Sequence, residues 1–174
     1  MGQFNGRPFL YVAAFGAFTE VSYGTPQPFK NTFGHLAYLL EGVSRLGSLK
    51  GYPLRVEHEG GVLEDEFLFG MVSNTVSVGG FKGLPACDVK LDDGLLEVVL
   101  VRQPKTAADV QAVLRAMALR QPSADGPVTA FHAAEVIFTC AESLPWTLDG
   151  EFGGAPERAE ILTRRHGTTI VHGK

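Results

Sequence analysis

The chain has 174 residues, and 45% of them are hydrophobic, which is enough apolar material for one domain with a sizeable core. Fifteen Lys and Arg residues against nineteen Asp and Glu leave a net charge of −4, and no basic cluster exceeds Arg164-Arg165. These numbers exclude a typical nucleic-acid binder, which needs a basic surface. Two well-separated cysteines, Cys87 and Cys140, and no apolar run of about 20 residues indicate a cytoplasmic protein.

The first part of the chain predicts a strand followed by a helix. Residues 9–14 form a short apolar run before Gly16, which is typical of a buried strand. Pro26 and Pro28 exclude a helix interior and predict a turn. After this turn a helix is expected that ends near Gly47, with an apolar face made by Phe33, Leu36, Ala37, Leu40 and Val43.

The middle of the chain predicts further strands joined by tight turns. Residues 54–59 alternate between the two faces expected of a half-exposed strand, and Gly60-Gly61 predicts a hairpin turn after it. A second strand is expected over residues 66–73. A glycine-rich loop follows at residues 77–83, and the Asp93-Gly94 turn precedes an apolar strand over residues 95–101.

The last part of the chain predicts a second helix and more strands. Thr106 and Asp109 have the spacing of a helix capping box, and apolar residues follow at helical spacing from Val110 to Met117. Strands are expected over residues 128–141, 158–163 and 168–172. Because the strands do not alternate regularly with helices, we predict a mainly β (α+β) fold, an antiparallel β-sandwich decorated by about two α-helices.

Two acidic turns are candidates for chemistry. At the first turn, Asp93 can offer a carboxylate and Lys90 and Leu95 can offer backbone carbonyls, a set of oxygen ligands that suits Mg²⁺. An Asp-Gly pair before a strand is also a common turn with no ligand, so both interpretations stay open here.

The second acidic turn covers residues 146–151. If this stretch is extended, Asp149 and Glu151 point to the same face, and their mutual repulsion makes one of them hold its proton more tightly. Such a pair suits a general base or an acid/base unit linked to Mg²⁺. A turn with two solvated acids is the alternative. The glycine-rich residues 77–81 could approach a phosphate, although a β-bulge or loop explains them equally well.

Taken together, these segments resemble the C-terminal domain of the soluble bacterial diacylglycerol kinases, within the wider lipid-kinase family. The resemblance extends from about Gln3 to Ile170. It rests on residues 11–20, on Thr25-Pro26-Gln27 and the residues up to Gly42, on Asn74 with residues 77–81, on residues 91–95 and on residues 148–151.

The resemblance implies transfer of the γ-phosphoryl group of ATP to the free hydroxyl of diacylglycerol or a related lipid, which gives phosphatidic acid. It implies that Asp149 is the base for the lipid hydroxyl and that Glu151 is the neighbouring acid. It also assigns Asp93 and the carbonyls of Lys90 and Leu95 to a structural Mg²⁺ site that links two domains.

The Gly-Gly-Asp-Gly-Thr motif of the family's N-terminal, ATP-binding domain does not occur in this sequence. We therefore expect residues 1–174 to be a single C-terminal domain with little or no kinase activity alone. The expected partners are a lipid, ATP and the surface of a membrane, through peripheral contact. An edge strand could pair two chains into a homodimer. The alternative is a non-catalytic β-sandwich that binds a lipid or a protein; a hydrolase that uses the Asp149/Glu151 pair has no other support.

Overall fold

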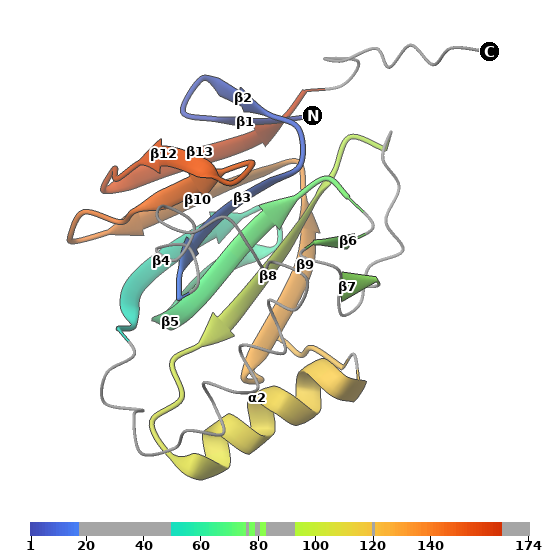
Figure 1. Ribbon diagram of the computed structural model, residues 1–174, viewed down its shortest axis with the longest axis vertical. Coiled ribbons are helices and arrows are strands. Elements are labelled where there is room, and N and C mark those ends of the chain that lie inside the picture. The colour runs from blue at the N-terminus through green and yellow to red at the C-terminus, as the bar shows by residue number, and fades with distance from the viewer. Residues whose placement is uncertain (18–49, 76, 79–80, 83–92, 120, 165–174) are drawn as a thin grey trace.

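The computed structural model describes residues 1–17, 50–75, 77–78, 81–82, 93–119 and 121–164. Within them, eleven strands form one antiparallel sheet, a small hairpin joins β6 (Ser77–Val78) to β7 (Phe81–Lys82), and one helix is present, α2 (Ala107–Leu119) (Figure 1). The mainly β prediction is confirmed. The helix expected around residues 33–43 and the strand expected over residues 168–172 lie outside the described residues.

The strands of the large sheet are short, apart from β5. In chain order they are β1 (Gly2–Phe4), β2 (Arg7–Phe9), β3 (Val12–Gly16), β4 (Tyr52–His58), β5 (Gly61–Ser73), β8 (Leu96–Arg102), β9 (Val128–Ala133), β10 (Glu135–Cys140), β11 (Trp146–Leu148), β12 (Glu151–Gly154) and β13 (Arg158–Thr163).

The long strand β5 connects two arms of this sheet. Its first half pairs with β4 and its second half pairs with β3. Both neighbours lie on the same edge of β5, because β8 occupies the other edge, opposite Tyr52 at Phe67 and opposite β3 up to Ser73. One arm continues from β3 to β11 and β12. The other arm continues from β4 to β10, β13, β1 and β2, while β8 and then β9 extend the opposite edge of β5. The predicted sandwich is therefore one continuous sheet that curls over itself.

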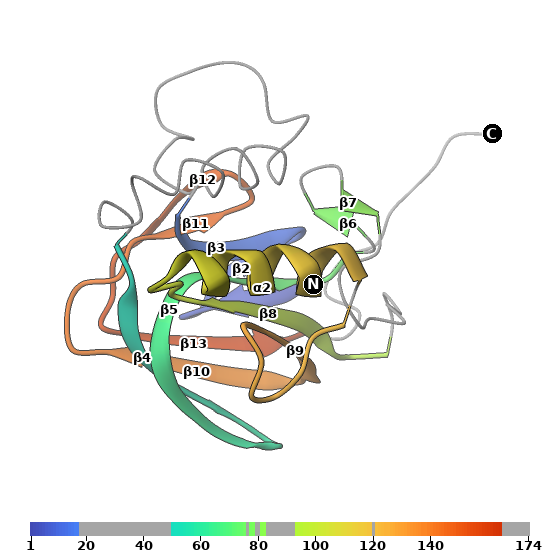
Figure 2. The same cartoon turned by 90° about the horizontal axis from the view of Figure 1, so that it is seen from below.

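The main core lies between the two arms. Trp146 of β11 is fully buried, and its ring contacts Phe4 of β1 and Phe138 of β10 at centroid distances of 5.1 Å each. Phe15 of β3 completes the contact at 4.9 Å from the Trp146 ring. Tilted ring pairs at these distances add to the stabilisation from burial alone. In Figure 2, β8 has α2 on one side and β13 and β10 on the other.

Helix α2 covers part of the outer face of the sheet. Val110 and Val113 of the helix are buried against Val99, Val101 and Val128 of the sheet. The predicted capping box is confirmed, since Asp109 Oδ2 accepts the N–H groups of Lys105 and Thr106 and Thr106 Oγ1 accepts the N–H of Asp109. These hydrogen bonds lower the pKa of Asp109.

Two predicted strands are each divided in the structure. The run 9–14 is β2 followed by β3, with Leu10 and Tyr11 as a link. The run 128–141 is β9 followed by β10, which separate at Ala134 because β9 pairs with β8 whereas β10 pairs with β4 and β13. In the first run the chain stays apolar across the break, and in the second Glu135 is the only charged residue, so the sequence pattern alone did not reveal either break.

Replacement of Trp146 by alanine tests the role of the core between the arms. We expect Trp146→Ala to lower the free energy of unfolding by about 3–5 kcal/mol, because the cavity left between the arms cannot collapse fully. Leu119→Ala is the control, since Leu119 is 52% exposed at the end of α2 and should change stability by less than about 0.5 kcal/mol. Urea denaturation of both variants measures this, and equal losses would contradict the proposed position of the core.

Candidate functional site

Asp149 and Gly150 form the two-residue loop of the hairpin between β11 and β12. Leu148 pairs with Glu151 across the loop, and the backbone φ angles are +52° at Asp149 and +89° at Gly150. Positive φ at both central residues is the type I′ arrangement, for which Asp-Gly is a favoured pair. The segment is therefore not extended, and the premise that extension places Asp149 and Glu151 on one face is wrong.

The carboxylate of Asp149 fixes the link between β2 and β3. Its Oδ2 accepts the N–H of Leu10 at 2.8 Å, and its Oδ1 accepts the N–H groups of Tyr11 at 2.8 Å and Val12 at 2.9 Å. The N–H of Asp149 in turn donates to the carbonyl of Val12 at 2.8 Å. Hydrogen bonds to a charged acceptor are stronger than neutral ones, so one side chain holds the hairpin against the start of β3.

Glu151 has a different environment from that of Asp149. Its side chain is exposed and makes no hydrogen bond or ion pair with any other residue that the structure describes. Its carboxylate is thus open to solvent at the edge strand β12, two residues after a carboxylate that is already engaged.

The second acidic turn leads into β8. Asp93 Oδ1 accepts the N–H of Leu95 at 2.9 Å, and Gly94 between them has a φ of +83°, a conformation that glycine adopts readily. Lys90, the third residue of the predicted Mg²⁺ site, lies outside the described residues. The structure thus places two of the three predicted ligand residues on one tight turn.

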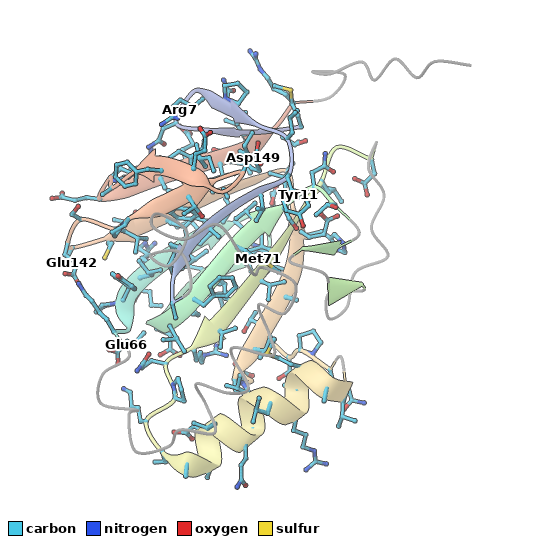
Figure 3. The ribbon with its side chains drawn as sticks, viewed as in Figure 1. Arg7, Tyr11, Glu66, Met71, Glu142 and Asp149 are labelled. Atoms are coloured by element: carbon cyan, nitrogen blue, oxygen red, sulfur yellow. The ribbon has the colours of Figure 1, made fainter. Side chains whose placement is uncertain are left out.

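The strand register brings both turns to the same end of the sheet. Leu148 lies opposite Ala13 of β3, Val12 lies opposite Ser73 of β5, and Ser73 lies opposite Glu97 of β8. The two turns are separated by three strand spacings, or about 14 Å. Figure 3 shows Asp149 and Tyr11 at this end, with Met71 lying between it and α2. We call the end of the sheet that carries the Asp149 hairpin and the Asp93 turn the acidic end.

The acidic end contains one residue that the sequence analysis did not identify, Glu97 on β8. Its side chain is 1% exposed, and among the described residues its carboxyl oxygens have no well-formed hydrogen bond, since the N–H groups of Glu97 itself and Thr75 act on them only weakly. Burial raises the pKa of Glu97 to about 7; the N–H groups of Glu97 itself and Thr75 oppose the rise, and the charge of Asp93 adds to it. A lone acid within the apolar run 95–101 was the available signal.

The described residues lack a ready-made metal cluster and a membrane-spanning helix. No group of three or more His, Cys, Asp or Glu side chains in those residues is arranged to hold a metal ion. A cation at the Asp93 turn therefore needs ligands of other kinds as well, such as backbone carbonyls. No helix in the described part of the chain has the length and apolar character needed to span a membrane.

Comparison with known sequences identifies one family. The model of the YegS C-terminal NAD kinase beta sandwich-like domain matches residues 20–165. The diacylglycerol kinase of Bacillus subtilis (strain 168) is 34% identical over 167 residues, which are 95% of this chain and 54% of that protein. The diacylglycerol kinase of Staphylococcus aureus (strain Newman) is 33% identical, with 95% and 52% covered. The chain thus spans about half the length of these curated relatives.

Solved structures show the same architecture. A Bacillus anthracis protein ascribed to the diacylglycerol kinases matches with a TM-score of 0.67 and 23% identity, over 94% of this chain and 52% of that protein. A second structure, of a diacylglycerol kinase from the same strain, gives a TM-score of 0.62 and 21% identity, with 94% and 53% covered. At these identities the likeness concerns the fold.

Matched replacement of each carboxylate by an amide separates the two acids of the hairpin. We expect Asp149→Asn to lower the free energy of unfolding by about 1–3 kcal/mol, because the NH₂ that replaces Oδ2 cannot accept the N–H of Leu10 and the charge is lost. Glu151→Gln should change stability by less than about 0.5 kcal/mol. Urea denaturation gives both values, and an equally small effect at Asp149 would contradict the fixing role of its carboxylate.

The raised pKa of Glu97 predicts a specific pH dependence of stability in metal-free buffer. The folded chain binds the proton of the Glu97 carboxyl group more tightly than the unfolded chain does. The stabilisation of the fold by this proton is therefore fully present below the ordinary pKa of 4.5 and is lost as the pH rises through about 7. Urea denaturation at pH 5, 6, 7 and 8 should show wild type losing stability relative to Glu97→Gln. Parallel curves for the two proteins would contradict the assignment.

Proposed function

Because the chain belongs to the family of the YegS C-terminal NAD kinase beta sandwich-like domain, we propose that it is the lipid-side half of an ATP-dependent lipid kinase. The proposed reaction is phosphorylation of diacylglycerol, or of a related lipid hydroxyl, to phosphatidic acid. One observation carries the proposal, namely that the sheet register brings the Asp149 hairpin and the Asp93 turn to the same acidic end. The names of relatives that match 95% of the chain point to the same reaction.

In this proposal Asp149 takes the proton of the attacking lipid hydroxyl. Phosphoryl transfer depends on positioning and charge stabilisation, and a base that orients the nucleophile is one of its recurring parts. A carboxylate has about four acceptor positions, of which three are filled by the N–H groups of residues 10–12. Oδ2 accepts from Leu10 alone and keeps a position for the hydroxyl. Glu151, exposed on β12, is the neighbouring acid.

We further propose that Asp93, with the carbonyls of Lys90 and Leu95, holds Mg²⁺. The surroundings fit such an ion, because Ser73 Oγ is buried without a hydrogen-bond partner among the described residues and the buried carboxyl group of Glu97 lies close enough to Asp93 for the two charges to interact. When bound, Mg²⁺ supplies positive charge next to these carboxylates. ATP would be bound mainly by the part of the enzyme outside this chain.

Exposed apolar side chains surround the proposed base and suit the apolar part of a lipid. Leu10 is 59% exposed, Tyr11 38% and Phe152 55%, and all three lie in segments that Asp149 contacts or adjoins. We propose that they meet acyl chains in a peripheral contact with the cytoplasmic surface of a membrane.

A fusion to the remainder of the Bacillus subtilis relative tests the proposed reaction. The chain replaces the segment that it matches in that kinase, and transfer from radiolabelled ATP into vesicles containing diacylglycerol is measured. We expect labelled phosphatidic acid from the fusion and little or none from the 174-residue chain alone. Asp149→Asn in the fusion should lower turnover by about 100-fold or more, the usual contribution of a general base.

Circular dichroism before the assay confirms that each fusion is folded at the assay temperature. A folded wild-type fusion without transfer would favour the alternative of a non-catalytic lipid- or protein-binding module. Equal turnover of wild type and Asp149→Asn would remove the base from Asp149, and a large loss in Glu151→Gln alone would move it to Glu151.

A further inference from the structure

The two outermost strands of the curled sheet meet at the side chain of Arg7. Strands β12 and β2 stand at the two ends of the strand order, and within the described residues each of them pairs with one other strand. Arg7 of β2 donates from Nη1 to the carbonyl oxygen of Gly153 on β12 at 3.1 Å, between residues 146 positions apart in the sequence. A charged side chain therefore joins the two arms where the sheet has no further strand to add.

The side chain of Arg7 lies on the core face of β2. Side chains two residues apart on a strand share a face, and Phe9 is buried in the core with 1% exposure. Phe4 of β1 is directly opposite Arg7 in the strand register and is also buried, with its ring against that of Trp146. Trp146 belongs to β11, the strand that pairs with β12. The guanidinium group thus crosses from one arm to the other at the rim of the aromatic core.

The β11–β12 hairpin is attached at two points to the segment that runs from β2 into β3 (Figure 3). The first point is the carboxylate of Asp149, which accepts the N–H groups of residues 10–12. The second is the carbonyl of Gly153, four residues further along the chain. Glu151 and Phe152 lie between these points. A single attachment would leave the hairpin free to turn about it, whereas two attachments fix its orientation.

The contact is suited to holding this hairpin without supporting the whole fold. A hydrogen bond from a charged donor is stronger than a neutral one, and the guanidinium group is planar and permanently charged. Arg7 is nevertheless exposed, and the strands of both arms have their own backbone ladders. Loss of the contact should therefore open the edge locally and leave the rest of the sheet folded.

We propose that Arg7 is a positioning residue, which joins β2 to β12 and thereby fixes the orientation of the hairpin that carries Asp149 and Glu151. It acts through the carbonyl of Gly153 and not on the reacting atoms. The expected effect on turnover rests on the proposed function, whereas the expected effect on the mobility of the hairpin does not.

Amide hydrogen exchange of the 174-residue chain, followed by NMR spectroscopy, tests the proposal without any assay of activity. Arg7→Met removes the donor and the charge and keeps an unbranched side chain. We expect the protected N–H groups of the β11–β12 hairpin to exchange about tenfold faster in Arg7→Met, with β4 and β10 unchanged. Arg158→Met is the matched control, because Arg158 is exposed on β13 and its ion pair is with Glu160 of the same strand, and it should exchange as the wild type does.

The kinase fusion described above measures the consequence for turnover. We expect Arg7→Met in the fusion to lower kcat by about tenfold with an unchanged KM for ATP, because a misplaced group slows the reaction without weakening nucleotide binding. Arg7→Lys keeps a cationic donor on a long stem and should recover part of this loss and part of the slow exchange. It also serves as the test variant if Arg7→Met does not fold. Arg158→Met should leave kcat unchanged.

Each other outcome has a defined meaning. Wild-type exchange of the hairpin in a folded Arg7→Met protein overturns the proposal whatever the fusion does. Faster exchange with wild-type kcat overturns the positioning role. Arg7→Lys that behaves as Arg7→Met in both measurements overturns the role of the donated hydrogen bond. Faster exchange in Arg7→Met together with an inactive wild-type fusion supports the joining of β2 to β12 and counts against the proposed function alone.

Discussion

The arrangement of the whole sheet depends on the place where β5 exchanges β4 for β3 as its neighbour. The exchange occurs at Leu68, whose carbonyl accepts the N–H of Ala17 at 2.9 Å just beyond β3. Gly16 makes the contact possible, since it has a φ of +85° and a Cβ there would lie 2.2 Å from the Leu68 carbonyl oxygen. β5 thereby pairs with the first strand of each arm along one edge, and the two arms can face each other across the aromatic core.

This exchange also determines what the acidic end contains. The arm that begins at β3 brings β11 and its hairpin alongside the end of β5, while β8 reaches the same end from the other edge. Asp149 then joins the hairpin to residues 10–12 through three hydrogen bonds. The acidic residues that are far apart in the sequence meet because of strand order, and backbone N–H groups hold the carboxylates of Asp149 and Asp93 in place.

The sequence was informative where local chemistry decides the structure. The capping box at Thr106 and Asp109 predicts the start of α2 because both partners lie within one turn of helix. The break in the run 9–14 was not predictable in this way, since it depends on a carboxylate 137 residues away from Val12. The Asp149-Gly150 pair carried a hairpin signal that alternation arguments overlooked. Glu97 is the one acid in the apolar run 95–101, but the run alone does not show that its side chain is buried at the acidic end.

The pairing of β1 with β13 has a consequence for how this fold can be carried by a longer protein. Gly2 lies opposite Thr163, and the N–H of Arg164 donates to the carbonyl of Met1 at 2.8 Å, so the first and last strands of the described sheet adjoin. Figure 1 shows β1 and β13 side by side near the N-terminus. Polypeptide attached before β1 and after β13 would leave the domain at neighbouring points. Such a domain can be inserted into another chain with little distortion of either partner.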